Sequence, residues 1–453
     1  MASENIIDFQ SLTDKVGRFN LRDKTFLIPQ MNRIGGHLLA ATFRGFGIRA
    51  KVMDTCRDLE LGQKYTSGKE CYPCQITTGD ILSFMGEEKE RLGDRFDPED
   101  YIYFMPEADG PCRFGMYNKF QRIVLDSLPG LDRLKIGAMT TKDGYALTGM
   151  IEAGRIGDLR KAAYLSVVVG DVLDRLLWRV RPYERAPGLA DEFIERAMGR
   201  LEDAFETHAG GRNPDPILDT LEAVILEGKA LMDPAIPPKP LIGIVGEIYL
   251  RTHVKANQDV IRVLERYGAE VVNASIAEWI NYTTYDRLRE AKHGFRMGLK
   301  RFRIPEMTGH LKKIFGYGKE LLFQQAKQKQ VYRRARRLLD IAEDHRVGHL
   351  EDILKEDDLF SFDVGTEACL SIPGIVAYAR EHFNGVVNVY PFTCMPSTIT
   401  SAVVKPLMNR LRIPYLDTPY DATTQPGREA AIRTFMYQAR QHFKRNGRKK
   451  DHG

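Results

Sequence analysis

Alternation of apolar runs with helical periods, repeated on both sides of a proline-rich segment, limits most strongly what this chain can fold into. Residues 25–28 have the pattern of a buried strand, residues 36–45 that of a helix, and residues 50–53 that of a second strand. This order favours a parallel sheet. The same order begins again at residues 241–245. The sequence therefore predicts an α/β fold with two Rossmann-like, open parallel-sheet lobes that carry helical extensions.

The remaining elements follow from the same patterns. Proline inside a helical pattern favours a kink, which we expect at Pro406. We expect further strands at residues 101–105, 269–272, 386–390 and 413–416, and helical structure at residues 120–128, 157–229, 253–267, 286–346, 397–411 and 427–443.

Four prolines between residues 234 and 240 mark the clearest boundary in the chain. Proline at this density fixes φ and removes backbone donors, so the segment favours a stiff, extended connector. The predicted domains are an N-terminal α/β lobe with a helical extension at 1–233, a proline-rich linker at 234–240, a C-terminal α/β lobe at 241–443 and a basic tail at 444–453.

Composition narrows the class of protein. The 453 residues include 66 Lys and Arg against 61 Asp and Glu, a net charge of +5 that is too mild to indicate a nucleic-acid binder. No apolar run is long enough to span a bilayer, and the first thirty residues lack a signal-peptide pattern. We expect a cytoplasmic protein. The basic stretch at 286–346 is typical of a solvated helix face or of a docking surface for an acidic partner. A binding site for the phosphates of CoA or for nucleic acid is a less favoured interpretation.

Cysteines are few but unevenly placed. Cys71, Cys74 and Cys112 lie in the first quarter of the chain, in loops rich in Pro and Gly, and Cys394 lies in a similar loop near the end. Cys112 and Cys394 each follow a predicted parallel strand, and ligand sites in open α/β sheets form at the carboxyl ends of such strands. A site that uses both groups of thiols has to be assembled by folding, between the two lobes.

Three interpretations fit these thiols. A redox dithiol at Cys71 and Cys74 is disfavoured by Pro73 inside the pair and by the two further loop cysteines. A structural zinc site is disfavoured because such sites usually join two compact Cys-x₂₋₄-Cys pairs. A [4Fe–4S] cluster accepts three or four thiolates from separate loops and fits the spacing best.

Three strings carry a resemblance to a known family. Gly-Lys-Glu-Cys71-Tyr-Pro-Cys74-Gln, Gly-Pro-Cys112-Arg-Phe-Gly and Pro-Phe-Thr-Cys394-Met-Pro resemble the 2-hydroxyacyl-CoA dehydratase superfamily, and more narrowly its acyl-CoA dehydratase activase-related branch. The resemblance extends through the Gly-Glu-Ile-Tyr string that starts at Gly246.

The resemblance implies a cubane cluster in the cleft between two Rossmann-like lobes. Its ligands would be Cys71, Cys112 and Cys394, with Cys74 as a fourth candidate that would close the open iron position. A related branch holds a larger double-cubane cluster, which is an alternative cofactor here.

The resemblance also implies a function. Members accept low-potential electrons from an ATP-dependent activase, a cluster-containing ATPase, and use them for radical chemistry on an acyl-CoA thioester. This chain would be a dehydratase-like lyase or a reductase component, acting with a homologous subunit or as a homodimer. It contains neither a P-loop nor a dinucleotide-binding glycine motif, so ATP hydrolysis would belong to the partner. The alternative is a non-enzymatic zinc or iron–sulfur scaffold that binds a partner.

Several other polar or sulfur-containing residues have competing interpretations. Cys56 and Cys369 fit small buried side chains better than ligands. Glu247 and Arg251 follow a predicted strand and fit either substrate contacts or helix capping and salt bridges. Thr393 and Ser397 are candidates for hydrogen bonds to cluster sulfur.

Overall fold

A computed structural model describes residues 14–108, 110–140, 147–301 and 304–447. The chain forms two compact units, and each is described by itself. Unit 1 contains the residues up to Ala163 and the short segment Phe205–Arg212, and unit 2 contains Tyr164–Ala204 and the residues from Asn213 onward. None of the helices in the described residues has the length and apolar character needed to cross a membrane.

Unit 1 is built on a five-stranded parallel sheet in the order β1-β5-β4-β2-β3. Phe26 of β2, which lies between β4 and β3, pairs with Ala50 on one side and with Ile102 on the other. Phe26, Leu27 and Ile28 are all buried, as expected of a parallel strand covered on both faces. The strands are Val16–Gly17 (β1), Thr25–Ile28 (β2), Arg49–Val52 (β3), Tyr101–Phe104 (β4) and Lys135–Gly137 (β5).

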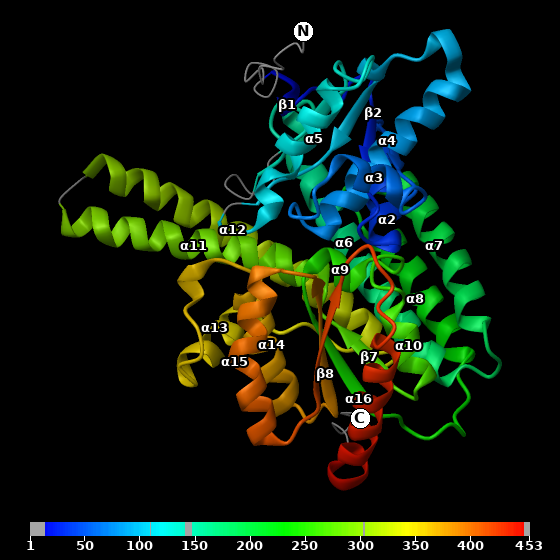
Figure 1. The fold of residues 1–453 in the computed structure, drawn as a ribbon. Helices are drawn as coiled ribbons and strands as arrows, with labels where there is room; N and C mark the ends of the chain where they lie inside the picture. The colour runs from blue at the N-terminus through cyan, green and yellow to red at the C-terminus, as the bar shows by residue number, and fades with distance from the viewer. Residues whose placement is uncertain (1–13, 109, 141–146, 302–303, 448–453) are drawn as a thin grey trace. The chain divides into compact units, whose positions relative to one another are not determined.

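Four helices connect or follow these strands (Figure 1). The first begins where the side chain of Asn32 accepts a hydrogen bond from the backbone N–H of Gly35 at 2.6 Å, a normal N-cap. The strand-helix-strand start predicted from the sequence is confirmed. The helices are Arg33–Gly45 (α2), Leu59–Tyr65 (α3), Tyr72–Leu92 (α4) and Tyr117–Asp126 (α5).

Unit 2 contains a four-stranded parallel sheet in the order β7-β6-β8-β9. Every residue of the β6 strand is buried. All four strands were predicted, although β9 begins and ends later in the sequence than expected. The strands are Leu241–Gly246 (β6), Glu270–Asn273 (β7), Gly385–Pro391 (β8) and Tyr415–Tyr420 (β9).

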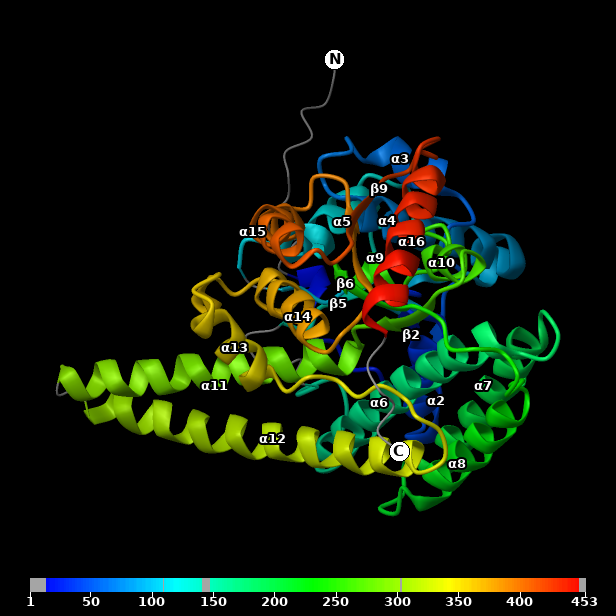
Figure 2. The ribbon, with the colours of Figure 1, turned by 90° about the horizontal axis from the view of Figure 1, so that it is seen from below.

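Helices cover both faces of this second sheet. α13, α14 and α15 lie on one side, and α10 and α16 on the other (Figures 1 and 2). α15 continues through Pro406 as one helix. The helices are Ile156–Val180 (α6), Leu189–His208 (α7), Asp215–Ala230 (α8), Ile248–Thr252 (α9), Val260–Arg266 (α10), Ile276–Lys300 (α11), Ile304–Arg336 (α12), Val347–Glu356 (α13), Ala368–Arg380 (α14), Met395–Leu411 (α15) and Arg428–Asn446 (α16).

The single helix predicted at residues 253–267 is wrong, because α9 ends at Thr252 and α10 begins only at Val260. The side chain of Asn257 donates to the carbonyl of Leu250 at 2.7 Å and accepts from the N–H of Val260 at 3.2 Å. A side chain that bonds the backbone in this way replaces helical hydrogen bonds. The segment between the two helices is therefore held by its own polar contacts.

Two other predicted helical limits differ from the structure. The predicted helical stretch at 286–346 begins earlier, with α11, and its last helix ends at Arg336. The predicted basic tail starts inside a helix, since α16 continues to Asn446, and residues 448–453 lie outside the described residues.

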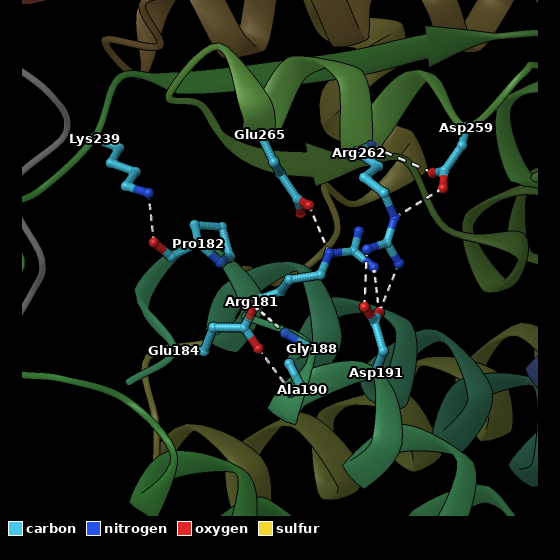
Figure 3. A network of polar contacts seen from close by, with 10 residues as sticks. All are labelled: Arg181, Pro182, Glu184, Gly188, Ala190, Asp191, Lys239, Asp259, Arg262 and Glu265. Atoms are coloured by element: carbon cyan, nitrogen blue, oxygen red, sulfur yellow. Dashed lines mark hydrogen bonds and ion pairs between the residues drawn. The ribbon is translucent and has the colours of Figure 1, made fainter. Parts of the chain in front are cut away.

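An ion-pair network links the helices before the proline-rich segment to the sheet region of unit 2 (Figure 3). Arg181 contacts Glu265 at 2.6 Å and Asp191 at 3.1 Å, and Arg262 makes a bidentate contact with Asp191 at 2.7 and 2.8 Å. Burial raises the pKa of Glu265 to about 7, while Arg181 opposes the shift. These contacts explain why residues 164–204 belong to unit 2. The domain limits predicted at 233 and 240 stay a prediction, because compact packing alone does not define a folding domain.

A second buried network anchors the start of α11. Asp171 accepts hydrogen bonds from the backbone N–H groups of Ile276 and Ala277, both at 2.9 Å. Arg175, one turn further along α6, is buried and forms an ion pair with Asp344. Burial and the charge of Asp344 raise the pKa of Asp171 to about 8, so this carboxyl group holds a proton at neutral pH.

The raised pKa of Asp171 predicts a stability that depends on pH. Between the ordinary pKa of 3.8 and the folded value of about 8, the folded chain binds a proton that the unfolded chain has lost. The free energy of unfolding should therefore fall as pH rises through this window, by at most about 1.4 kcal/mol per pH unit from this residue. Urea unfolding at pH 5, 6, 7 and 8 measures how steeply the free energy of unfolding falls with pH. This fall should be smaller in the Asp171→Asn variant. An unchanged slope would contradict the assignment.

Candidate functional site

The first cysteine loop leads directly into helix α4. Cys71 occupies the N-cap position of α4, with φ at 101°, and Cys74 lies in the first turn of the helix. Pro73 is one of the first two helical residues, where a missing N–H costs nothing. Pro73 is therefore compatible with a cysteine pair that opens a helix and, contrary to the expectation from the sequence, its presence does not disfavour a redox dithiol. In contrast to a thioredoxin-like site, the element before the pair is helix α3 rather than a strand.

Two glycines hold this loop by letting α3 and α4 approach closely. A Cβ atom on Gly62 would lie 2.1 Å from the carbonyl oxygen of Gln75, the residue after Cys74. A Cβ atom on Gly79 would lie 2.7 Å from the carbonyl oxygen of Asp58. Only glycine permits backbone contact at these distances. The start of α4 is thus fixed against α3 on the turn that carries the cysteines.

The second cysteine lies in unit 1 as well, at the carboxyl end of the sheet. Cys112 follows β4 and is the N-cap of a 3₁₀ turn, Arg113–Met116, that runs into α5. The guanidinium of Arg113 donates to the carbonyl oxygen of Lys69 at 2.6 Å. This hydrogen bond ties the Cys112 loop to the Cys71 loop. The segment begins at position 109, which lies outside the described residues.

Cys74 and Cys71 are both buried in the same apolar cluster of unit 1, and Cys74 is the more enclosed of the two. Its side chain is fully buried in the apolar core of unit 1, among Ile81, Met85 and Tyr103. Burial raises the pKa of its thiol strongly, and the hydroxyl of Thr78 only partly offsets this effect. Cys74 therefore behaves as a neutral core thiol in this structure.

The third cysteine lies in unit 2. Cys394 follows β8 and is the N-cap of α15, and its carbonyl accepts from the backbone N–H of Thr398 at 3.0 Å and from its hydroxyl at 2.7 Å. Thr393, just before it, has φ at 64°, in the left-handed region. The backbone N–H and the hydroxyl of Ser397 both face the sulfur of Cys394. Ser397 therefore lies beside this thiol, and the hydrogen bonds of Thr393 and Ser397 to cluster sulfur stay a prediction.

Two buried carboxyl groups flank Cys394. Burial raises the pKa of Cys394, and the nearby charges of Glu367 and Glu247 raise it further. Burial and the nearby Glu247 raise the pKa of Glu367, and burial raises the pKa of Glu247 as well, so this buried pair of carboxyl groups favours holding a proton. One Glu367 oxygen accepts from the N–H of Ile248 at 3.0 Å, and the other is buried with no hydrogen-bond partner among the described residues.

Sequence reasoning missed Glu367. It immediately precedes α14, whereas Cys394 precedes α15, so no short motif contains both residues. Only the parallel order of the sheet brings their loops to one edge. A buried acid that follows Gly365 and Thr366 has no spacing signal that would have singled it out.

Glu247 and Arg251 have the helix-capping and backbone-binding roles that the sequence left open. Glu247 is the N-cap of α9 and accepts from the N–H groups of Tyr249 and Leu250 at 3.0 and 2.9 Å. Arg251 is buried and donates to the carbonyl oxygens of Gly246 and Ser275 at 3.1 and 3.0 Å. Both residues therefore shape the edge of the sheet next to Cys394.

The two cysteines that were interpreted as structural do not occupy the N-cap position of a helix. Cys369 is the second residue of α14 and is fully buried. Its sulfur lies 3.6 Å from the carbonyl oxygen of Phe362. Cys56 is only partly buried, less than expected, and its backbone N–H donates to Asp80 at 2.8 Å.

In the described parts of the chain, no three or more His, Cys, Asp or Glu side chains are grouped so that they could hold a metal ion. Cys71, Cys74 and Cys112, which share unit 1, therefore do not form such a group among themselves. The assignment of Cys71, Cys74, Cys112 and Cys394 as ligands stays a prediction.

Comparison with known proteins adds no assignment. No model of a known protein family matches this chain, and no curated protein matches it.

Because α3 and α4 approach each other so closely, we expect one added methyl group at Gly62 to destabilise the folded chain. Gly62→Ala should lower the free energy of unfolding by about 1–3 kcal/mol, since the added Cβ collides with backbone. Gly86→Ala is the matched control on α4, because its Cβ would meet nothing within 4 Å and alanine favours a helix. Urea unfolding of both variants provides the measurement. Equal stability of the two would show that the glycine contact does not hold the cysteine loop.

Proposed function

We propose that this chain is an iron–sulfur protein whose cluster is bound by Cys71, Cys112 and Cys394, and that it accepts low-potential electrons from an ATP-dependent activase. One observation carries the proposal. All three cysteines occupy the N-cap position of a helix or helical turn, whereas Cys74, Cys56 and Cys369 do not.

The helix starts fit the charge of the proposed group. Backbone N–H groups of a first helical turn carry partial positive charge and have no partner within their helix. They stabilise thiolates, and hydrogen bonds to sulfur tune iron–sulfur clusters. Ser397 would supply such donors at Cys394 through its N–H and its hydroxyl. A thiol whose pKa is raised by burial, as at Cys394, still loses its proton when a metal binds it.

The environment of Cys74 supports three ligands rather than four. Its sulfur is fully buried in an apolar core, and it does not begin a helix. Three thiolates leave one iron of a [4Fe–4S] cluster open to water or substrate. We therefore favour the single cubane over the double-cubane alternative.

The protein's own residues would support the chemistry in two ways. When bound, the cluster supplies a single low-potential electron to a CoA thioester or related substrate, as the resemblance to the dehydratases implies. Glu367 belongs to the buried carboxyl pair beside Cys394, its pKa is raised, and one of its oxygens has no hydrogen-bond partner among the described residues. It is therefore a candidate acid for the hydroxyl group that leaves as water in a dehydration. Arg251 and Glu247 would hold the surrounding loops in place.

Cysteine variants test the cluster directly. Cys71→Ser, Cys112→Ser and Cys394→Ser, purified without oxygen, should each lose most of the iron and the broad absorption near 400 nm, because each removes one thiolate. Cys369→Ser and Cys74→Ser are the controls and should keep the iron, at a cost in stability from changes in a packed core. Iron analysis, with EPR before and after dithionite reduction, provides the readout.

Three results of this experiment would oppose the proposal. Colourless wild-type protein with one zinc per chain would favour the zinc scaffold. Loss of iron in Cys74→Ser would make Cys74 a fourth ligand and close the open iron position. Loss in Cys369→Ser but not in Cys394→Ser would overturn the ligand assignment.

Glu367→Gln tests the proposed acid separately from the cluster. The variant should keep its iron and its EPR signal, because the amide retains the acceptor for the N–H of Ile248. It should lose dehydration of a 2-hydroxyacyl-CoA by roughly 10²–10⁴-fold, the usual contribution of a general acid. Full activity in this variant would exclude Glu367 as the acid, and loss of iron would indicate a structural role.

A further inference from the structure

Helices α11 and α12 form a long antiparallel hairpin that extends away from the rest of unit 2 in both views (Figures 1 and 2). The inner face of α12 is fully used against α11. Gln324 donates to Thr284 at 3.1 Å, and Asn281 donates to Gln328 at 2.9 Å. The hairpin is therefore preformed, with two helices that contact each other.

The outer face of α12 carries a line of exposed apolar side chains. Ile304 is 70% exposed, Leu311 41%, Phe315 71% and Leu322 69%. At 100° per residue these four positions fall within an arc of about 40° and extend over roughly 27 Å. We call these four residues the outer stripe. Exposed large apolar residues in such an alignment mark an interaction site rather than chance exposure.

The spacing of the outer stripe identifies the shape of the occupant. Its residues are separated by seven, four and seven positions, so they share one heptad register, in which the two seam positions between them are Thr308 and Gly318. A helix that lies in a membrane interface has a wider apolar face. Here Lys312 and Lys319, both exposed, lie only about 60–80° from the centre of the stripe. The stripe is therefore shaped to receive one helix.

Charge identifies the chemistry of that helix. From Ile304 to Lys329, α12 carries five lysines against two glutamates. Within the described residues, no acidic side chain forms an ion pair with Lys312 or Lys319, the two lysines beside the stripe. A second copy of this chain would bring lysines against lysines, which opposes self-association. Glutamates that flank an apolar seam would pair with these lysines, as e and g positions do in coiled coils.

We propose that the outer stripe binds an acidic, amphipathic helix of a partner protein, which packs as a coiled coil along α12. This inference does not depend on the iron–sulfur proposal, because the arm and its charges exist whether or not a cluster binds. It assigns a protein-docking role to part of the basic stretch.

A designed peptide tests the docking surface on the full-length protein. The probe is a 28-residue helix of four heptads with Ile at a, Leu at d and Glu at e and g, which repels its own copies. Fluorescence anisotropy should show binding with a Kd in the micromolar range, and 0.5 M NaCl should weaken it several-fold, since charge pairs contribute. A peptide with Lys in place of Glu should bind at least tenfold more weakly.

The double variant Phe315→Glu, Leu322→Glu should weaken binding of the acidic peptide at least tenfold, because it places charge in the seam. Both side chains are exposed, so circular dichroism should show an unchanged fold. Leu226→Glu is the matched control, since Leu226 is a 51% exposed leucine on α8, and it should leave binding unchanged.

Four results would overturn the proposal. They are no binding of the acidic peptide, equal binding of the lysine peptide, and equal loss in Leu226→Glu. The fourth is that the wild-type protein binds anionic phospholipid vesicles, single-stranded RNA or a second copy of the chain instead of the peptide, and that the double variant loses this binding.

Discussion

The functional account depends on one interaction, that between a sulfur atom and the positive end of a helix. Cys71, Cys112 and Cys394 each stand where a helix or helical turn begins. Ser, Thr, Asp and Asn are the residues that usually occupy this position, because their oxygens accept from the first N–H groups. At Cys394 the sulfur lies next to the backbone N–H and the hydroxyl of Ser397. The rest of each unit holds these helix starts in position.

Different contacts hold the helix starts in the two units. In unit 1, Gly62 and Gly79 allow backbone contact between α3 and α4, and Arg113 links two cysteine loops through the carbonyl of Lys69. In unit 2, Glu247 and Arg251 fix the loops at the carboxyl ends of the strands. These are polar and steric constraints on backbone. They leave Cys112 and Cys394 beyond the carboxyl ends of strands, where ligands bind in open sheets, and Cys71 at the start of α4.

Much of the fold could be predicted because apolar strand runs such as residues 241–245 are local signals. The α4 helix was not predicted, since Pro73 suggested a loop although proline suits the first turn of a helix. The break in the helix before Val260 was not predicted, because it depends on hydrogen bonds between one side chain, that of Asn257, and the backbone. Glu367 was not predicted as a site residue, because its place beside Cys394 arises from the order of the strands, which no local sequence pattern indicates. The cysteines themselves were found because their loops are unusual in composition.

Iron K-edge X-ray absorption of the wild-type protein, purified and measured without oxygen, tests the central claim most directly. The account predicts iron with sulfur as its nearest neighbours and further iron atoms just beyond, as in a cubane cluster. Iron surrounded by nitrogen or oxygen, or protein that carries zinc and no iron, would contradict it.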